Sequence, residues 1–468
     1  RLNNNLGIAL RNQWRLKEAL FYFNECLKIR LELQGENNED VAKTYNNIGV
    51  VLSDIGKNKE ALDNYEKSLR IKERIQSKDT LAIAKNYMNI GAIYGELKNT
   101  TQAMAFFDQA QRVLESIKET DTRETWSQLY NNIAGVYTYR RDYYTAIQYH
   151  QQSIALKIAV YKSENDVQVA RSYNNLASVY LEMKESNKAL KLSEDALRII
   201  IEVKKDTSAD AGLAYFHIGG IYGSTGRFPE AIESLNKAVD RLLPNFKENH
   251  IYIAECYSSL ASVYEQQYQL EQALEYYQKG LQIFSKVIGG EAMTFDMART
   301  LVNIGLINKN AGNAPEAIAT FDRVINSWSE DKPINPELKF TLFEALLFKA
   351  ELLSDRVQTP QDARHAIEVY EQALLWGENF RDDLEEHYSK VEFLSFINRV
   401  AEGLILLLVS GPGATEETKQ RAFGIAEKSK AFLLHESIRE SHALAYSGLP
   451  DSLRNKEINL RKHIEYYE

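Results

Sequence analysis

The chain is poor in cysteine, in proline and in long apolar stretches. Its 468 residues include only eight prolines and two cysteines, Cys26 and Cys256. Two cysteines so far apart in the sequence exclude a disulfide framework and a cysteine-rich metal site. The longest strongly apolar run, Leu404 to Val409, falls far short of the ~20 residues that a membrane-spanning helix needs. The residues therefore give no reason to expect a membrane as a partner.

The chain also lacks an excess of positive charge. Its 56 lysines and arginines are outnumbered by 65 aspartates and glutamates, so the formal net charge is −9. Sequence-independent binding of nucleic acid needs a basic surface that displaces counterions, so we predict no direct nucleic-acid partner. With 44% hydrophobic residues, the chain can bury a large core and is not of the disordered class.

The sequence starts at Arg1 rather than at a methionine, and it has no signal peptide. We expect it to be a fragment whose native start is missing, together with any targeting segment. The compartment stays open, with the cytoplasm favoured. By length alone the chain would hold about three domains of roughly 150 residues each, but its internal repeats change that count.

A repeat of 42 to 44 residues organises most of the chain. In each repeat a small residue is followed twelve positions later by an alanine. Around the small residue, apolar side chains recur at i, i+3, i+4 and i+7, as in Tyr45, Ile48, Gly49 and Leu52, which is one face of an α-helix. Each repeat is therefore interpreted as a helical hairpin whose apolar face is buried by its neighbours. The pairs are Gly7/Ala19, Gly49/Ala61, Gly91/Ala103, Ala134/Ala146, Ala177/Ala189, Gly219/Ala231, Ala261/Ala273 and Gly305/Ala317.

This pattern resembles the tetratricopeptide repeat family over about residues 1–375. The stretch from Asp40 to Gly49 is similar to the long-helix variety found in kinesin light chains. The resemblance implies an all-α fold, an α-solenoid of about nine antiparallel helical hairpins wound into a right-handed superhelix. The ninth repeat departs from the pattern: Ala366, Tyr370 and Ala373 fit its second helix, but Ser354 stands where a small partner is expected.

Asparagine dominates one place on the face opposite the core. Asparagine is a mediocre helix former, so its presence in six of eight helix interiors needs another reason. The eight residues at this place are Asn5, Asn47, Asn89, Asn132, Asn175, His217, Ser259 and Asn303, and four residues before the last seven lie Lys43, Lys85, Gln128, Arg171, Leu213, Glu255 and Arg299.

Two interpretations of this stripe stay open. The resemblance implies that the first helices line a concave wall, where asparagines hydrogen-bond the main chain of an extended peptide. An amide suits that role because it both donates and accepts, and a cation one turn away would attract a carboxylate. In the other interpretation the asparagines bridge neighbouring helices. The acidic Asp54, Glu96 and Glu182 lie farther along the face, so the ligand is not expected to be purely acidic. The predicted peptide-binding residues are Lys43, Asn47, Lys85, Asn89, Asn132, Arg171, Asn175, His217, Arg299 and Asn303.

No pattern in the chain predicts catalysis, a metal site or a cofactor. The glycine-rich stretch from Gly219 to Gly226 resembles a phosphate-binding loop in composition. However, Gly219 is the small residue of the repeat, and the strand that precedes such loops is not predicted here. His435 and His442 are too far apart on a predicted helix to share a metal. Cys26 and Cys256 are interpreted as buried thiols, since no histidine is tied to them by spacing.

The period fades after about Trp376. We predict a helical hairpin that closes the array at 376–447, with helices at about 383–408 and from Thr415, and the start of a linker helix at 448–468 that is cut at Glu468. The stretches Arg421–Ala431, Glu436–Arg439 and Gly448–Leu453 resemble the segment leading into CHAT domains, caspase-like cysteine peptidase modules of bacteria. Catalytic residues of that family would lie beyond Glu468, and the helices could also simply end the solenoid.

The leading hypothesis is a scaffold that binds a protein or peptide in its concave groove and is the sensor or regulatory arm of a CHAT-type protease. Some relatives of this arrangement answer to a ribonucleoprotein effector, so that partner class stays open. The alternative is a stand-alone cargo or assembly adaptor of the kinesin-light-chain kind. In both, this chain itself is not an enzyme.

Overall fold

A computed structural model describes residues 2–118, 120–246, 250–288, 293–327, 336–384 and 390–427. The chain divides into two compact units, Arg1–Ala345 and Leu346–Glu468. Every regular element in the described ranges is a helix, which confirms the all-α prediction. None of these helices is both long enough and apolar enough to cross a lipid bilayer.

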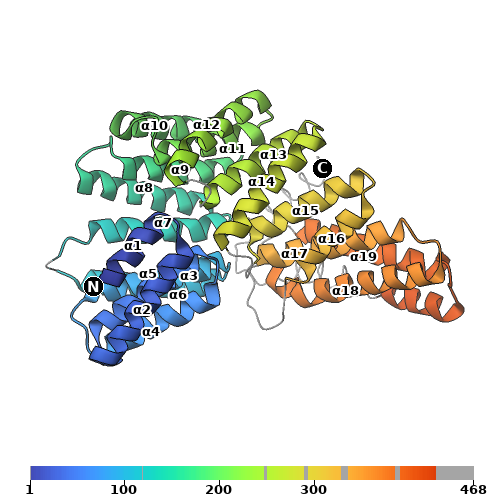
Figure 1. The fold of residues 1–468 in the computed structure, drawn as a ribbon, viewed down its shortest axis with the longest axis horizontal. Helices are drawn as coiled ribbons and strands as arrows, with labels where there is room; N and C mark the ends of the chain where they lie inside the picture. The colour runs from blue at the N-terminus through green and yellow to red at the C-terminus, as the bar shows by residue number, and fades with distance from the viewer. Residues whose placement is uncertain are drawn as a thin grey trace, which may run out of the picture. The chain divides into compact units, whose positions relative to one another are not determined.

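The first unit is a series of antiparallel helical hairpins in chain order (Figure 1). Consecutive helices make most of the contacts, as expected for a solenoid in which each repeat packs on its neighbours. The helices are α1 (Leu2–Asn12), α2 (Leu16–Gln34), α3 (Glu39–Asp54), α4 (Asn58–Arg74), α5 (Thr80–Glu96), α6 (Thr100–Ser116), α7 (Arg123–Tyr139), α8 (Tyr143–Tyr161), α9 (Val167–Glu182), α10 (Ser186–Lys204), α11 (Ala209–Ser224), α12 (Phe228–Phe246), α13 (Ile251–Gln266), α14 (Leu270–Ile288), α15 (Phe295–Asn310), α16 (Ala314–Ile325) and the first part of α17 (Pro336–Ser354).

In the five hairpins whose small residue is a glycine, a large side chain of the second helix packs on that glycine. A methyl carbon added to Gly49 would lie 2.7 Å from the ring of Tyr65, and one added to Gly91 would lie 2.6 Å from the ring of Phe107. The same spacing of 16 residues joins Gly7 to Phe23, Gly219 to Leu235 and Gly305 to Phe321. The predicted partner alanines are all fully buried: Ala19, Ala61, Ala103, Ala146, Ala189, Ala231, Ala273 and Ala317.

The turn inside each hairpin places one residue in the left-handed backbone region. In three hairpins this residue is a glycine, namely Gly56, Gly226 and Gly312, with φ of 83°, 73° and 81°. In the other hairpins the same turn position holds a residue other than glycine. Its left-handed backbone costs conformational energy, but its side chain can contact other parts of the protein. These residues are Trp14, Lys98, Arg141, Lys184 and Tyr268.

Three of these turns contact a helix start six repeats farther along the chain. Trp14 packs on His250, just before α13, with ring centroids 4.4 Å apart. Gly56 lies against the methyl group of Thr294, the N-cap of α15. Lys98 forms an ion pair of 3.1 Å with Glu337 in the first turn of α17. We call these three contacts the seam; together they join successive turns of the superhelix within the first unit.

In the second unit, α18 (Pro360–Leu384) packs against α19 (Lys390–Ser410), and a further helix covers 416–427. Tyr370 of α18 packs on Gly403 of α19. Ala366 and Ala373, which the sequence assigned to the same helix of the ninth repeat, are fully buried. The helix expected from about residue 383 corresponds to α19, which begins at Lys390. Residues 383 and 384 belong to the preceding helix, α18. The division at Ala345 lies 30 residues before the predicted end of the array at 375, and α18 continues through that position. The proposed domain limits stay predictions, and 448–468 lies outside the described residues.

Replacing Gly91 by alanine should destabilise the array by about 1–2 kcal/mol, because the added methyl group overlaps the ring of Phe107. Urea denaturation followed by circular dichroism measures this change. The control is Gly135→Ala on α7, where the methyl group meets nothing within 4 Å. That variant should gain up to about 1 kcal/mol from helix propensity; equal effects of the two substitutions would contradict the packing role of Gly91.

Replacing Trp14 by alanine should open the seam locally. Amide hydrogen exchange should then rise together in the α1–α2 turn and in the first turn of α13, although 236 residues separate Trp14 from His250. Tyr268→Ala is the matched control, since Tyr268 occupies the same turn position in a later repeat and is 89% exposed. Exchange that rises only around Trp14 would show that the seam contact does not couple the two repeats.

The seam should weaken in acid through His250. This residue is 3% exposed, its Nδ1 accepts a hydrogen bond from the backbone N–H of Tyr252, and burial lowers its pKa from 6.5 to about 4. The pKa of His250 is lower in the folded state than in the unfolded state, so protons bind the unfolded chain more tightly. The contribution of neutral His250 to the free energy of unfolding is therefore fully present above pH 6.5 and is lost as the pH falls toward 4. At pH 4 the loss is about 3 kcal/mol. His250→Asn keeps a helix cap without titrating in this range, so its stability should change less between pH 7 and pH 4 than that of the wild type.

Candidate functional site

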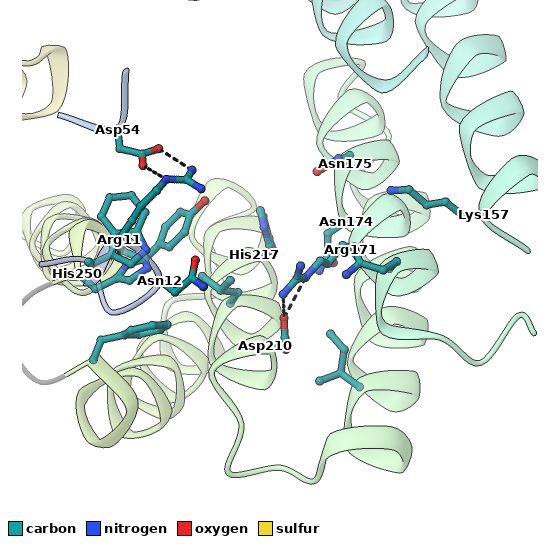
Figure 2. Close-up of a pocket in the computed structure, with 16 residues that line it drawn as sticks. Arg11, Asn12, Asp54, Lys157, Arg171, Asn174, Asn175, Asp210, His217 and His250 are labelled. Atoms are coloured by element: carbon teal, nitrogen blue, oxygen red, sulfur yellow. Dashed lines mark hydrogen bonds and ion pairs between the residues drawn. The ribbon is translucent and has the colours of Figure 1, made fainter. Parts of the chain in front are cut away.

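A cleft of about 610 Å³ lies on the inner side of the first unit. Its lining comes from the end of α1 and the α1–α2 turn, from the end of α3, from α8 to α11, and from the segment where α12 ends and α13 begins. Figure 2 shows Arg11, His217 and Arg171 facing the same space from three different helices. The cleft therefore combines repeats that are distant in sequence, and the seam contact between Trp14 and His250 forms part of its wall.

One wall of the cleft is cationic. Nε of Arg171 donates a hydrogen bond of 2.9 Å to Asp210, and Nζ of Lys204 donates one of 2.8 Å to the other oxygen of the same carboxylate. Burial opposes ionisation of Asp210, but these hydrogen bonds outweigh it and lower its pKa. Lys157 binds the hydroxyl of Ser172 at 2.7 Å, and burial followed by the charge of Arg171 lowers the lysine pKa. The side chain of Arg171 is still 49% exposed.

The opposite wall is aromatic. The ring of His250 lies 4.1 Å from that of Phe246 and 5.0 Å from that of Tyr252, between centroids, and Trp14 completes the cluster. Arg11 stands beside it, held by a hydrogen bond of 2.6 Å to Asp54. This wall offers ring faces and one neutralised ion pair, which suits apolar or aromatic side chains of a ligand.

The structure brings three of the ten predicted binding residues into this cleft, namely Arg171, Asn175 and His217. Burial lowers the pKa of His217, so its imidazole is neutral at pH 7. The lining of this cleft does not include the other seven: Lys43, Asn47, Lys85, Asn89, Asn132, Arg299 and Asn303. Three of the predicted cations are paired with acids of the following repeat, as Lys43 with Asp79, Arg171 with Asp210 and Arg299 with Glu344.

Several of the predicted asparagines bridge neighbouring repeats. The Nδ2 groups of Asn47 and Asn89 each donate to an asparagine oxygen 43 residues earlier, at 3.1 Å, and Asn175 donates to Asn131 at 2.7 Å. Asn303 instead donates to the hydroxyl of Tyr277. We call the bonds between asparagines the asparagine ladder. They show that packing is one role of this stripe, whereas ligand binding by these residues stays a prediction.

Sequence reasoning missed the acceptors of the ladder. They lie one residue before the predicted donors, at Asn4, Asn46 and Asn131, and Asn174 occupies the same register on α9. This second asparagine column was visible as a repeat in the sequence. The seam residues Trp14 and His250 gave no comparable signal, because only the superhelix brings them together.

Two acidic residues outside the cleft, Glu96 on α5 and Glu255 on α13, have raised pKa values. Burial, followed by the charge of Asp54, raises the pKa of Glu96 to about 7. Burial and the charge of Asp296 raise the pKa of Glu255 to about 8. The described residues contain no group of histidine, cysteine and acidic side chains suited to a metal ion.

The other candidate groups of the sequence also have structural roles. Cys26 and Cys256 are both buried free thiols, and burial raises the pKa of Cys256 far above its usual range. The glycine-rich stretch begins inside α11, where a methyl group on Gly219 would meet Leu235, and it ends at Gly226 in the turn inside the hairpin, so it is not a phosphate loop. His435 and His442 lie outside the described residues.

Comparison with known proteins gives one curated relative, Protein KINESIN LIGHT CHAIN-RELATED 1 of Arabidopsis thaliana. It is 29% identical over 116 residues, which is 25% of this chain and 19% of that protein. The chain thus matches less than a fifth of the length of this relative.

Solved structures with a similar arrangement include a Rap protein complexed with competence and sporulation factor, with a TM-score of 0.49 and 16% identity over 86% of this chain and 98% of the other. A Signal Transduction ATPase with Numerous Domains that has a tetratricopeptide repeat sensor, from Pyrococcus horikoshii, gives a TM-score of 0.48 and 16% identity over 84% and 55% of the two chains. The putative kinesin light chain repeats of Podosopora anserina give 0.36 and 17%, over 44% and 95%.

Family profiles cover more of the chain. One profile described as tetratricopeptide repeat matches residues 1–74, 127–202 and 210–286, and a second with the same description matches 84–113. Together these segments make up more than half of the sequence, and each coincides with the helical hairpins of the first unit. The chain therefore belongs to the tetratricopeptide repeat family, whose arrays are protein-binding scaffolds.

Proposed function

We propose that this scaffold binds an extended peptide segment of a partner protein in the cleft of the first unit. The observation that carries the proposal is the composition of the cleft, in which amides and cations face an aromatic cluster across about 610 Å³. Amide side chains that donate and accept match the main chain of a peptide. The rings of Trp14, Phe246 and Tyr252 match its apolar side chains.

The charges of the cleft favour a ligand of mixed character. Arg171 and Lys157 attract a carboxylate or a carbonyl oxygen on one side, whereas Asp54 stands on the other. Asp54 is engaged by Arg11 and Asp210 by Arg171 and Lys204, so these acids are compensated within the protein. The predicted residues outside the cleft, such as Asn89 and Asn132, would extend the binding surface along the inner helices.

We further propose that ligand binding regulates a caspase-like cysteine peptidase of the CHAT type attached beyond Glu468. The support is the sequence resemblance of 421–468, of which only 421–427 lies in the described part of the chain. A ligand that holds the seam in one arrangement would bias the curvature of the array, and the partner could be part of a ribonucleoprotein. The alternative is a stand-alone adaptor. Sequencing the reading frame past Glu468 separates the two, since a stop codon shortly afterwards contradicts the protease arm.

The peptide-binding proposal is tested with random twelve-residue peptides displayed on phage and selected on the full chain. The dissociation constant of a selected synthetic peptide is then measured by calorimetry. Leu213, on α11, is half-buried and lines the cleft. Leu213→Trp should fill the space and weaken binding by about tenfold or more, which corresponds to about 1.4 kcal/mol.

The control is Val203→Trp on α10, where the side chain is 50% exposed and does not line the cleft. This variant should bind the peptide as tightly as the wild type, and both variants should keep the wild-type circular dichroism spectrum. The proposal fails if no peptide is selected, or if Leu213→Trp binds the selected peptide with unchanged affinity.

A further inference from the structure

The asparagine ladder has no rung between the two repeats that meet in the cleft at Asn174 and His217. In three places an asparagine donates Nδ2–H to an asparagine 43 or 44 residues earlier. The same spacing of 43 residues leads from Asn174 to His217, so His217 stands where the asparagine donor to Asn174 would be. In the part of the chain that the structure describes, no hydrogen bond joins these two residues. The ladder thus stops between α9 and α11, where both side chains line the cleft.

The interruption leaves a buried acceptor without a partner. Asn174 is only 5% exposed, and its Oδ1 has no hydrogen-bond partner among the described residues. A buried polar atom without a partner costs about 1–3 kcal/mol, and native structures tend to satisfy such atoms. In Figure 2 the side chain of Asn174 lies near Arg171, across from His217. The orphaned oxygen is therefore placed where a ligand in the cleft can supply a donor.

The surroundings select the kind of donor. Arg171 lies one helical turn before Asn174 on the same helix, so the two side chains share one face. Lys157 from the neighbouring helix α8 lines the same wall. Two cations beside the acceptor disfavour an ammonium or guanidinium group of a ligand. A neutral N–H avoids this repulsion, and a carbonyl oxygen of the same amide would be attracted by Arg171.

We propose that the gap between Asn174 and His217 is the anchor of the cleft, where a neutral amide N–H of the ligand donates to Oδ1 of Asn174 and so replaces the missing rung of the asparagine ladder. This inference rests on the proposed peptide-binding function and deepens it. Histidine at 217 keeps the gap open, because the asparagines at the same place in three other repeats, Asn47, Asn89 and Asn175, each close the corresponding gap. The amide comes from the main chain of the ligand or from an asparagine or glutamine side chain.

His217→Asn tests the proposal, because it introduces the donor that the ladder uses elsewhere. The variant should bind the phage-selected synthetic peptide about tenfold more weakly, while its melting temperature rises by about 2 °C because the buried oxygen is now satisfied. A gain in stability coupled to a loss of binding is not expected from a residue that merely packs. Ser259→Asn is the matched control, since Ser259 has the same register one repeat later, where Phe216 occupies the acceptor place. It should leave both quantities unchanged.

The source of the amide is identified on the peptide. Each backbone nitrogen is N-methylated in turn, and each asparagine or glutamine is replaced by leucine. One of these changes should weaken binding to the wild-type chain, and the same change should have little effect on His217→Asn. A sensitive N-methyl position assigns the anchor to the main chain, whereas a sensitive side chain assigns it to a side-chain amide.

The outcomes separate the two proposals. If Leu213→Trp abolishes binding but His217→Asn binds as tightly as the wild type, the cleft binds peptide and the anchor is wrong. Tighter binding by His217→Asn, or a set of peptides in which no single amide matters, also overturns the anchor. If no peptide is selected, the proposed function fails and the anchor fails with it.

Discussion

The close packing of the two helices of a hairpin at a glycine or alanine sets the geometry of the whole array, and in five hairpins a large side chain packs on a glycine there. Because a methyl group on Gly91 would overlap Phe107, the two helices of that hairpin can approach only where glycine removes the side chain. The same pairing recurs at Gly7, Gly49, Gly219 and Gly305. Repetition of one local geometry at a nearly constant period turns a chain of hairpins into a regular superhelix.

The superhelix then creates contacts that no single repeat contains. Six repeats bring the α1–α2 turn to the start of α13, and the following turns repeat this contact at Thr294 and Glu337. The cleft lies next to the first of these contacts and uses Trp14 and His250 as part of its wall. The cleft and the seam thus share residues, so under the proposed function a ligand in the cleft would also act on the closure of the superhelix.

The stripe of polar residues packs neighbouring repeats against each other, and under the proposed function it also contacts the ligand. Where donors and acceptors alternate regularly, as at Asn47 and Asn4, the amides satisfy each other between repeats. Where His217 interrupts the alternation, Asn174 keeps an unsatisfied oxygen within the cleft. Under the proposed function, this unpartnered acceptor defines the binding position, with no need for a special sequence motif.

The helical hairpins, their period and the buried alanines could be predicted from the sequence, because they depend on contacts within one repeat or between adjacent ones. Three residues of the cleft, Arg171, Asn175 and His217, were also among the predicted binding residues. The contact between Trp14 and His250 could not be predicted, since the two residues are 236 positions apart and carry no shared pattern. The tertiary structure likewise showed that Lys43 and Arg299 are engaged by acids of the next repeat. The physical reason is that periodicity encodes nearest-neighbour packing, whereas the contact between superhelical turns results from small rotations summed over six repeats.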